Sequence, residues 1–398
     1  MKNLFPILFV EINNLEYIFA AGDKDENNHF KLIYKKIVPN LGINNSKILD
    51  FDLTHNTIKE NIYLIEQKLK FTFKDVVLIL NTFQCSFINL TGYKKLNGSQ
   101  ISKENITYIL NSLKSTIDDF EIQKKIIHIF NSKYCLDNEK IENLPIGLYG
   151  DFYSHELSFC LINNNDYKNI NNIFKKCNLK IQKVLLKSFV EGSYISKGSE
   201  SFNTFYHIKI NQNNSQIFYF ENDSLKFEQN FNFGSDLVLR DIAKVTSLKI
   251  DNVKKILKNI KLSRDMPKDE LVEKELFENE NYVKIKKRLL FEIAEARIEE
   301  FAEKIIIKNV NFKAYKKKDK VVFMKFANKL DYEYFKDSYK FYFSENNKLL
   351  IKFLKNVPSE DFMNIINEIV NYGWRKEAIP VTHTKKSIIT RFFDMLFN

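Results

Sequence analysis

Two similar strand–turn–strand segments constrain the fold of this chain more than any other feature. The first has a turn at Asn13 and Asn14 between an apolar strand at residues 7–12 and a returning strand at 16–21. The second spans residues 205–220 and repeats the order strand, polar turn, strand. Short apolar strands bounded by turn residues favour hairpins of a sheet. The repetition suggests a duplicated fold in which each copy builds its own sheet.

Helical patterns between the strands indicate an α/β protein. Residues 57–69 have helical spacing, and the solidly apolar residues 75–80 are typical of a strand buried in an α/β sheet. Residues 83–160 are expected to form several strands and one helix. This pattern differs from that of the preceding residues, which suggests an inserted subdomain. We expect a long amphipathic helix at 283–307 and a last helix at 361–372.

The final segment, residues 385–398, combines a broad apolar arc with basic side chains. At about 100° per residue its large apolar residues share one side of a helix. A bulky apolar face beside Lys and Arg, following a Pro-containing connector, favours a helix lying in a membrane surface. The alternative is a terminal helix docked on the domain. The expected membrane-binding residues are Lys385, Lys386, Ile388, Ile389, Arg391, Phe392, Phe393, Leu396 and Phe397.

Composition excludes several other classes. With 398 residues, 44% hydrophobic and 28% charged, the chain is globular, with enough length for two or three domains. It has no apolar stretch long enough to span a membrane, and its N-terminal apolar run is too short for a signal peptide. The 4 Cys are widely spaced without a CxxC pair, which argues against zinc. The net charge of +11 comes from diffuse Lys interleaved with acidic residues, so we expect no nucleic-acid binding.

Four stretches in order resemble one family over nearly the whole chain. Residues 145–150 (P-I-G-L-Y-G) are similar to its P-I-G-M-x-G turn, and residues 174–194 to its V-E-R-C/A-G-L…G-L-A-S-S-Y run. Residues 295–300 (E-A-R-I-E-E) resemble its E-P-R-x-x-E helix, and residues 385–398 its membrane-targeting helix. The family is FtsA, the actin-like bacterial division protein that anchors the FtsZ ring to the membrane.

The resemblance implies a nucleotide site whose two loops have decayed here. The family binds ATP with Mg²⁺ through D-I-G-T-S-K and D-I-G-G-G-T-x-D, where Gly admits phosphate and Asp positions the metal. This chain has E-I-N-N-L-E at residues 11–16 and K-I-N-Q-N-N-S-Q at 209–216, and Met324-Lys325-Phe326 in place of an adenosine-side T-G-G. We expect Asn to keep the turns by adopting positive φ. We predict no cofactor and no catalysis; the degenerate positions are Asn13, Asn14, Lys209, Asn211, Asn213 and Lys325.

Arg297 is the residue that the resemblance marks for partner binding. In the family this Arg lies in the groove that receives the acidic C-terminal tail of FtsZ. The expected tail-binding residues are Lys287, Arg288, Arg297 and Glu300. A solvated, salt-bridged helix face is the alternative interpretation of the same charges. The resemblance further implies self-association into filaments, contact with later division proteins, and a location at the division septum on the cytoplasmic side of the cell membrane.

The sequence thus predicts an actin-like (ribonuclease H-like) α/β fold of two lobes with an inserted small subdomain and a C-terminal amphipathic helix. An active actin-like ATPase and a type IV pilus assembly adaptor of the same fold are the alternative functions. The predicted parts are 1–82 with 161–200 (first lobe), 83–160 (inserted subdomain), 201–250 with 306–373 (second lobe), 251–305 (insertion carrying the partner-binding helix), 374–384 (linker) and 385–398 (membrane-binding helix).

Overall fold

In a computed structural model, the chain divides into two compact units. The first holds the described residues up to Asn203, the segment Phe220–Phe227, and those from Val357 onward; the second holds Thr204–Tyr219 and Glu228–Asn356. The structure describes residues 6–24, 30–44, 47–81, 83–198, 202–277, 281–315, 320–327, 329–344, 349–355, 357–374 and 376–380.

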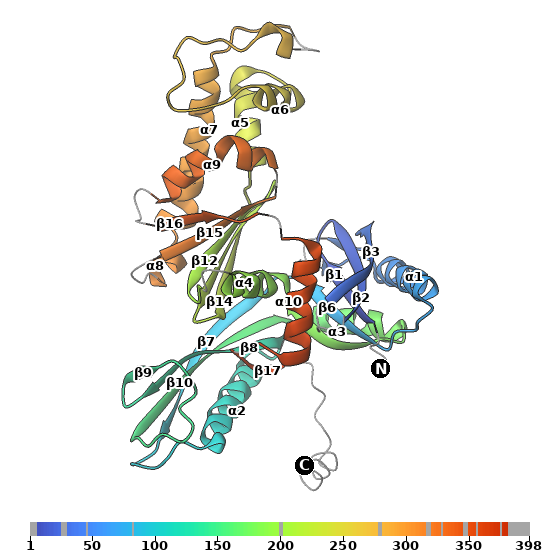
Figure 1. Cartoon of the computed structure of the whole chain (residues 1–398), viewed down its shortest axis with the longest axis vertical. Helices are drawn as coiled ribbons and strands as arrows, with labels where there is room; N and C mark the ends of the chain where they lie inside the picture. Colours follow the sequence, from blue (N-terminus) through green and yellow to red (C-terminus); the bar gives the residue numbers. More distant parts are fainter. Residues whose placement is uncertain are drawn as a thin grey trace. The chain divides into compact units, whose positions relative to one another are not determined.

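The first unit contains a five-stranded sheet in the order β11-β6-β1-β2-β3 (Figure 1). β1 pairs antiparallel with β2 and parallel with β6, which pairs parallel with β11. Apart from their first residues, β1 and β6 are buried throughout, which explains their continuous apolar sequences. The strands are β1 Ile7–Ile12, β2 Glu16–Lys24, β3 Phe30–Pro39, β6 Asp75–Leu80 and β11 Lys180–Leu186, with the short pair β4 Ile43–Asn44 and β5 Lys47–Ile48. The helices are α1 Phe51–Leu69, α3 Asn164–Lys176, α4 Lys187–Lys197 and α10 Ser359–Tyr372.

The inserted subdomain has its own sheet, in the order β17-β8-β10-β7, with β9 also on β8. Helix α2 packs on one face of this sheet, where Leu110 and Ile117 meet Leu157 and Phe159 in an apolar cluster (Figure 1). The elements are β7 Ser86–Lys95, α2 Lys103–Phe120, β8 Lys124–Leu136, β9 Glu139–Ile141, β10 Phe152–Asn163 and β17 Glu377–Pro380. The subdomain sheet therefore combines residues far apart in the sequence.

The second five-stranded sheet has the order β14-β13-β12-β15-β16, which repeats the pattern of the first. In both sheets a hairpin stands beside two further strands that run parallel to its first strand. The strands are β12 Phe205–Ile210, β13 Ser215–Glu221, β14 Ser224–Phe231, β15 Lys320–Phe326 and β16 Leu349–Phe353. The helical segments are α5 Asp236–Thr246, α6 Ile250–Asn259, η1 Lys274–Leu276, α7 Lys287–Ala302, the π-helical turn η2 Glu303–Ile307, α8 Val310–Ala314 and α9 Lys329–Ser344. The duplicated topology confirms the predicted actin-like α/β fold.

Three expected segments differ from the structure. The long helix expected at 283–307 begins at Lys287 and ends in the π-helical turn Glu303–Ile307. Residues 324–326 lie within β15 rather than after it. Part of the expected linker, Glu377–Pro380, is strand β17, paired antiparallel with β8. The expected membrane-binding helix, residues 385–398, lies outside the described residues.

Candidate functional site

The first turn, at Asn13 and Asn14, uses its own side chain to satisfy its backbone. Oδ1 of Asn13 accepts hydrogen bonds from the backbone N–H groups of Leu15, at 2.9 Å, and Glu16, at 2.8 Å. The Asn13 carbonyl accepts from Nδ2 of Asn40 at 2.6 Å. This is an Asx turn. The two N–H groups that could meet an anion are therefore already bonded within the loop.

Glu11, at the end of β1, is paired with a half-buried lysine that no sequence motif marks. Nζ of Lys187, the first residue of α4, lies 2.5 Å from Oε1 of Glu11, whose side chain is 4% exposed. Burial alone would lower the pKa of Lys187, but Glu11, Glu191 and Glu16 raise it above its ordinary value. An ammonium of the chain thus neutralises the carboxylate at this end of the loop.

The second turn is closed by a comparable set of internal bonds. Nδ2 of Asn211 donates to Oδ1 of Asn214 at 2.7 Å, and the backbone N–H of Asn211 donates to the Asn214 carbonyl at 2.9 Å. The backbone N–H of Ser235 donates to the Asn211 carbonyl at 2.9 Å. A Cβ at Gly234 would lie 2.2 Å from the Asn211 carbonyl oxygen, so only Gly fits there. Asn213, in contrast, is exposed.

The two predicted lysines of the second unit lie on neighbouring strands. Lys209 is 8% exposed, with Nζ 5.8 Å from the ring centre of Phe218. Lys209 and Lys325 are register partners of the parallel strands β12 and β15. Like charges at paired positions of adjacent strands repel each other. Lys325 thus belongs to a strand end and not to a loop.

The expectation that Asn holds these turns through positive φ is wrong. Among the described residues, the non-Gly positions with positive φ do not include Asn13, Asn14, Asn211 or Asn213. Side-chain amides take part in both turns instead: Asn13 accepts from backbone N–H groups at the first turn, and the Asn211 and Asn214 side chains bond each other at the second. In the part of the chain that the structure describes, no cluster of three or more His, Cys, Asp or Glu side chains has a metal-binding arrangement.

Arg297 of α7 is held by carboxylates from two helices. Its Nε lies 2.5 Å from Oδ2 of Asp241 on α5, and its Nη1 also pairs with Glu300 one turn further along α7. The hydrogen bond to Asp241 is the main cause that raises the pKa of the Arg297 guanidinium. The side chains of Arg297 and Asp241 are 25% and 28% exposed. The guanidinium is thus half-buried, charged and already bonded to acidic groups.

Two of the other predicted tail-binding residues, Lys287 and Arg288, do not form one patch with Arg297. Arg288 and Arg297 are nine positions apart, which at about 100° per residue places them on opposite sides of α7. Arg288 pairs with Glu292 at 2.9 Å and donates to the Arg264 carbonyl at 2.5 Å. Lys287 pairs with Glu270 at 2.8 Å and Glu273 at 2.5 Å. The four residues' role in partner binding therefore stays a prediction, centred on Arg297 and Glu300.

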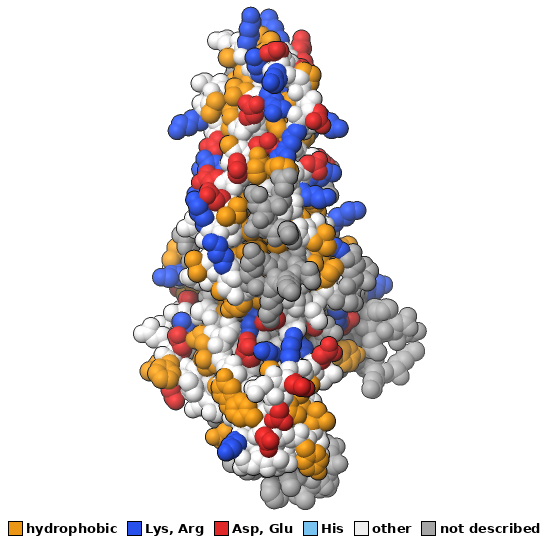
Figure 2. All heavy atoms as spheres, turned by 90° about the vertical axis from the view of Figure 1, so that its left-hand side faces the viewer, with side chains coloured by type: hydrophobic (Ala, Val, Ile, Leu, Met, Phe, Trp, Pro, Cys, Tyr) orange, Lys and Arg blue, Asp and Glu red, His pale blue; other side chains and the backbone are white. Residues whose placement is uncertain are grey.

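Charges of both signs are interspersed on the surface of this region. In Figure 2 the upper end of the molecule shows Lys and Arg side chains mingled with Asp and Glu. Among the described residues, ion pairs here include Lys286–Asp269, Arg264–Glu295, Lys304–Glu300 and Lys308–Glu303. Charges of opposite sign thus compensate one another locally among the described residues of this region.

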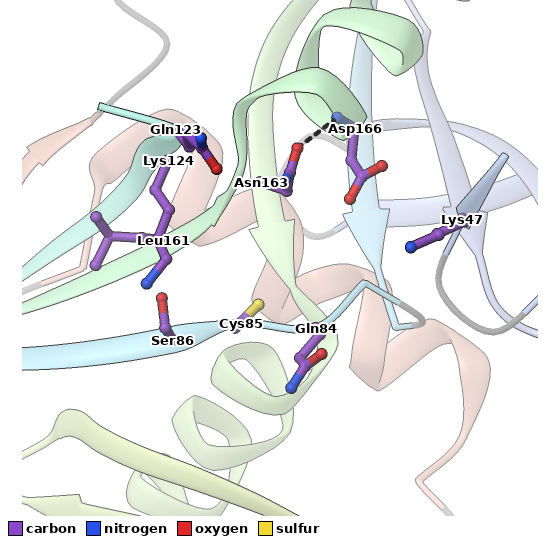
Figure 3. A pocket seen from close by; sticks show the side chains of 9 residues that line it. All are labelled: Lys47, Gln84, Cys85, Ser86, Gln123, Lys124, Leu161, Asn163 and Asp166. Atoms are coloured by element: carbon purple, nitrogen blue, oxygen red, sulfur yellow. Dashed lines mark hydrogen bonds between the residues drawn. The ribbon is translucent and has the colours of Figure 1, made fainter. Parts of the chain in front are cut away.

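A pocket of about 360 Å³ lies in the first unit, where the chain passes between the first sheet and the inserted subdomain (Figure 3). Its side chains are mostly polar. Asp166 has its pKa raised by burial, an effect that Lys47 opposes. The lining residues are Lys47, Gln84, Cys85, Ser86, Gln123, Lys124, Leu161, Asn163 and Asp166. The pocket includes none of the residues that the sequence singled out.

The expected membrane-binding residues, Lys385, Lys386, Ile388, Ile389, Arg391, Phe392, Phe393, Leu396 and Phe397, all lie outside the described residues. Within the described part, none of the helices has both the length and the apolar character needed to cross a membrane.

Comparisons with known proteins agree with this architecture. A type IV pilus biogenesis complex of PilM and PilN contains a chain with a TM-score of 0.51 and 10% sequence identity, covering 92% of this chain and 95% of that one. With the duplicated sheets, this likeness defines the chain as an actin-like protein by fold.

The sequence comparison is more particular. The chain is 22% identical over 255 residues to the cell division protein FtsA of Buchnera aphidicola subsp. Schizaphis graminum, and 21% identical over 250 residues to FtsA of Buchnera aphidicola subsp. Acyrthosiphon pisum. These alignments cover 64% and 63% of this chain and only 60% and 59% of the relatives' length. No family model matches the chain. The resemblance to FtsA found in the sequence is confirmed, as a divergent one.

Proposed function

We propose that the protein is a cell division adaptor that tethers FtsZ to the cytoplasmic membrane. The observation that carries the proposal is the similarity to FtsA in a chain with the duplicated actin-like topology. Tethering requires one site for FtsZ and one for the membrane, with no chemical step. Self-association into filaments and recruitment of later division proteins belong to the same proposal.

The FtsZ site that we propose is the face of α7 around Arg297. A guanidinium can bind the carboxylates of an acidic peptide through paired hydrogen bonds. Arg297 suits this role because its guanidinium is charged, is only partly exposed, and already donates hydrogen bonds to the carboxylates of Asp241 and Glu300. A carboxylate of the FtsZ tail would replace or share those internal acceptors.

The membrane site that we propose is the segment 385–398. Its apolar residues can insert among acyl chains while its Lys and Arg remain at anionic headgroups. One such short helix binds weakly, because ordering it offsets much of the gain from burial. Several copies arrayed on one FtsZ filament would bind tightly through avidity. The protein would then lie at the septum, on the inner face of the membrane.

We further propose that the adaptor works without ATP hydrolysis. Support comes from the first turn, where the Asn13 side chain accepts from two backbone N–H groups and Lys187 pairs with Glu11, and from the second turn, where the Asn211 and Asn214 side chains bond each other. An active actin-like ATPase would need phosphate-accessible N–H groups and carboxylates available for Mg²⁺.

A type IV pilus adaptor is the alternative, favoured by the fold shared with the PilM–PilN complex. We rank it second because the sequence similarity is to FtsA. A pilus adaptor would bind a pilus membrane peptide and not the FtsZ tail.

The decisive experiment is co-sedimentation of the full chain with anionic vesicles, with and without a labelled FtsZ tail peptide. The full chain should pellet and carry the peptide with it. A truncation after Thr384 should stay in solution but still bind peptide. Arg297→Glu should pellet without peptide, whereas Lys308→Glu, a matched charge reversal at a pair with Glu303, should behave as wild type. Pelleting of the truncation would refute the membrane site, and peptide binding by Arg297→Glu would refute the FtsZ site.

A further inference from the structure

Strand β17 occupies the edge of the inserted subdomain's sheet. It pairs antiparallel with β8 through Glu377 opposite Phe130, Ile379 opposite Ile129 and Pro380 opposite His128, with a register shift after Glu377. An open strand edge offers unpaired N–H and C=O groups that an added strand can satisfy. Positions 128–130 of β8 are therefore an acceptor for an extended segment.

A buried socket beside this edge holds the Glu377 carboxylate. Oε1 lies 2.9 Å from Nδ1 of His128 on β8, and Oε2 lies 2.7 Å from Nζ of Lys183 on β11. The side chains of Glu377 and His128 are 2% and 0% exposed. Each carboxylate oxygen thus meets a different sheet. A strand without an acidic residue here would leave the Lys183 ammonium buried without its counter-charge, so the socket selects for a carboxylate.

A second anchor lies three residues earlier, at Trp374. Its indole is 6% exposed and packs edge-on against Phe189, with ring centres 6.0 Å apart. Nε1 donates to the carbonyl of Asp223 at 2.9 Å. Between the anchors, the carbonyl of Lys376 accepts from the backbone N–H of Asn131 at 2.6 Å. The site therefore binds a short segment in which an aromatic residue is followed, three positions later, by an acidic one.

The resident segment is attached through a glycine hinge. Helix α10 ends at Tyr372 and is capped by Gly373, whose φ is 76°. No heavy atom lies within 4 Å of a Cβ built at Gly373. Gly changes conformation at little steric cost, and the described pairing beyond it is short, from Glu377 to Pro380. The segment can thus leave β8 by rotation at one residue, while the rest of the subdomain sheet keeps its own pairing.

We propose that the β8 edge and its carboxylate socket form a strand-acceptor site that residues 374–380 of a second copy of this chain can occupy in place of the resident segment. The second copy is the fitting occupant because it carries the same anchors at the same spacing. Reciprocal exchange of one terminal strand between two copies gives a closed dimer with no contact that the single chain lacks.

The test uses the full chain with its own segment weakened by Trp374→Ala and Glu377→Ala, and a labelled peptide of residues 374–384. The resident segment competes at an effective concentration of the order of millimolar. The doubly substituted chain should therefore bind the peptide at least about tenfold more tightly than the wild type in fluorescence anisotropy. A control peptide carrying Glu377→Gln should lose at least about tenfold in affinity, since it brings no charge to the socket.

Equal affinity of the two chains for the peptide, or of the two peptides for the substituted chain, would overturn the proposal. Should the substituted chain fail to fold by circular dichroism, the wild type decides. Sedimentation velocity of the wild type at rising concentration should show a dimer. Excess wild-type peptide should dissociate this dimer, whereas the Glu377→Gln peptide should not. A wild type that remains monomeric, or a dimer indifferent to both peptides, would refute strand exchange.

Discussion

Replacing Asp241 by Asn should strengthen binding of an acidic peptide at Arg297. The substitution keeps the size of the side chain and removes the charge that holds Nε of Arg297 at 2.5 Å. In the free protein this carboxylate acts as an internal competitor, because a peptide carboxylate must displace or share it. If Arg297 binds the FtsZ tail, weakening the competitor raises the affinity.

The size of the effect follows from the exposure of the pair. A hydrogen bond to a charged group is worth about 1.5–3 kcal/mol when buried. Arg297 and Asp241 are 25% and 28% exposed, and Glu300 remains as a second acceptor, so part of that energy is screened or retained. We take about 1 kcal/mol as the net gain, which corresponds to roughly a fivefold lower dissociation constant.

Calorimetric titration with the FtsZ tail peptide measures this directly. Glu303→Gln is the matched control: it removes one negative charge close to α7, from a pair with Lys308, and should leave affinity almost unchanged. If Asp241→Asn binds the peptide as the wild type does, or more weakly, Arg297 is not the peptide's anchor. An equal gain in Glu303→Gln would mean that overall charge, and not release of Arg297, drives binding.

Three other outcomes are expected. ATP turnover should not exceed that of a Lys209→Ala control, and Lys187→Met should not restore it, because the loop N–H groups stay bonded within the turns. Burial, together with the nearby charge of Lys376, lowers the pKa of His155 from 6.5 to about 4. Between these two pH values the unfolded state binds a proton that the folded state does not. The free energy of unfolding should therefore fall by about 3 kcal/mol as the pH drops from 6.5 to 4. Urea titrations should show this slope, and a His155→Gln variant should lack it. Vesicle binding of the full chain should weaken between low and high salt if Lys385 and Lys386 contact anionic lipid, and should be insensitive to salt if they do not.

The sequence predicted most strands of the two sheets because their apolar runs are short and bounded by turns. Residues 7–12 and 75–80 match β1 and β6 to the residue. The hairpin partner β14 and the later elements α9 and β16 were not anticipated. Helix α9, Lys329–Ser344, is rich in aromatic residues that favour strands as readily as helices, so periodicity left that segment undecided.

Residues of the candidate site could be predicted only where a sequence motif of the family includes them. Arg297 could be singled out by resemblance, but Asp241, its partner, is 56 positions earlier and carries no local signal. Lys187 and Glu11 are likewise 176 positions apart. Sequence patterns report spacing along one element, whereas these pairs depend on which elements become neighbours. Strand β17 was not predicted for the same reason. A short edge strand is stabilised by its partner strand and by buried side chains such as Glu377, neither of which its own sequence indicates.

The two turns show why loss of the phosphate motif is more than loss of glycine. At the first turn, restoring Gly at Asn13 would free the backbone N–H groups of Leu15 and Glu16, but Lys187 would still neutralise Glu11. Removing Lys187 alone would leave Glu11 buried and unpaired, which is costly, while the N–H groups remained bonded to Asn13. Each change is unfavourable or ineffective without the other. In this turn the Asn13 side chain bonds the loop N–H groups and the Lys187 ammonium pairs with the Glu11 carboxylate. We propose that these groups take the place of the anion and the cation of a nucleotide site.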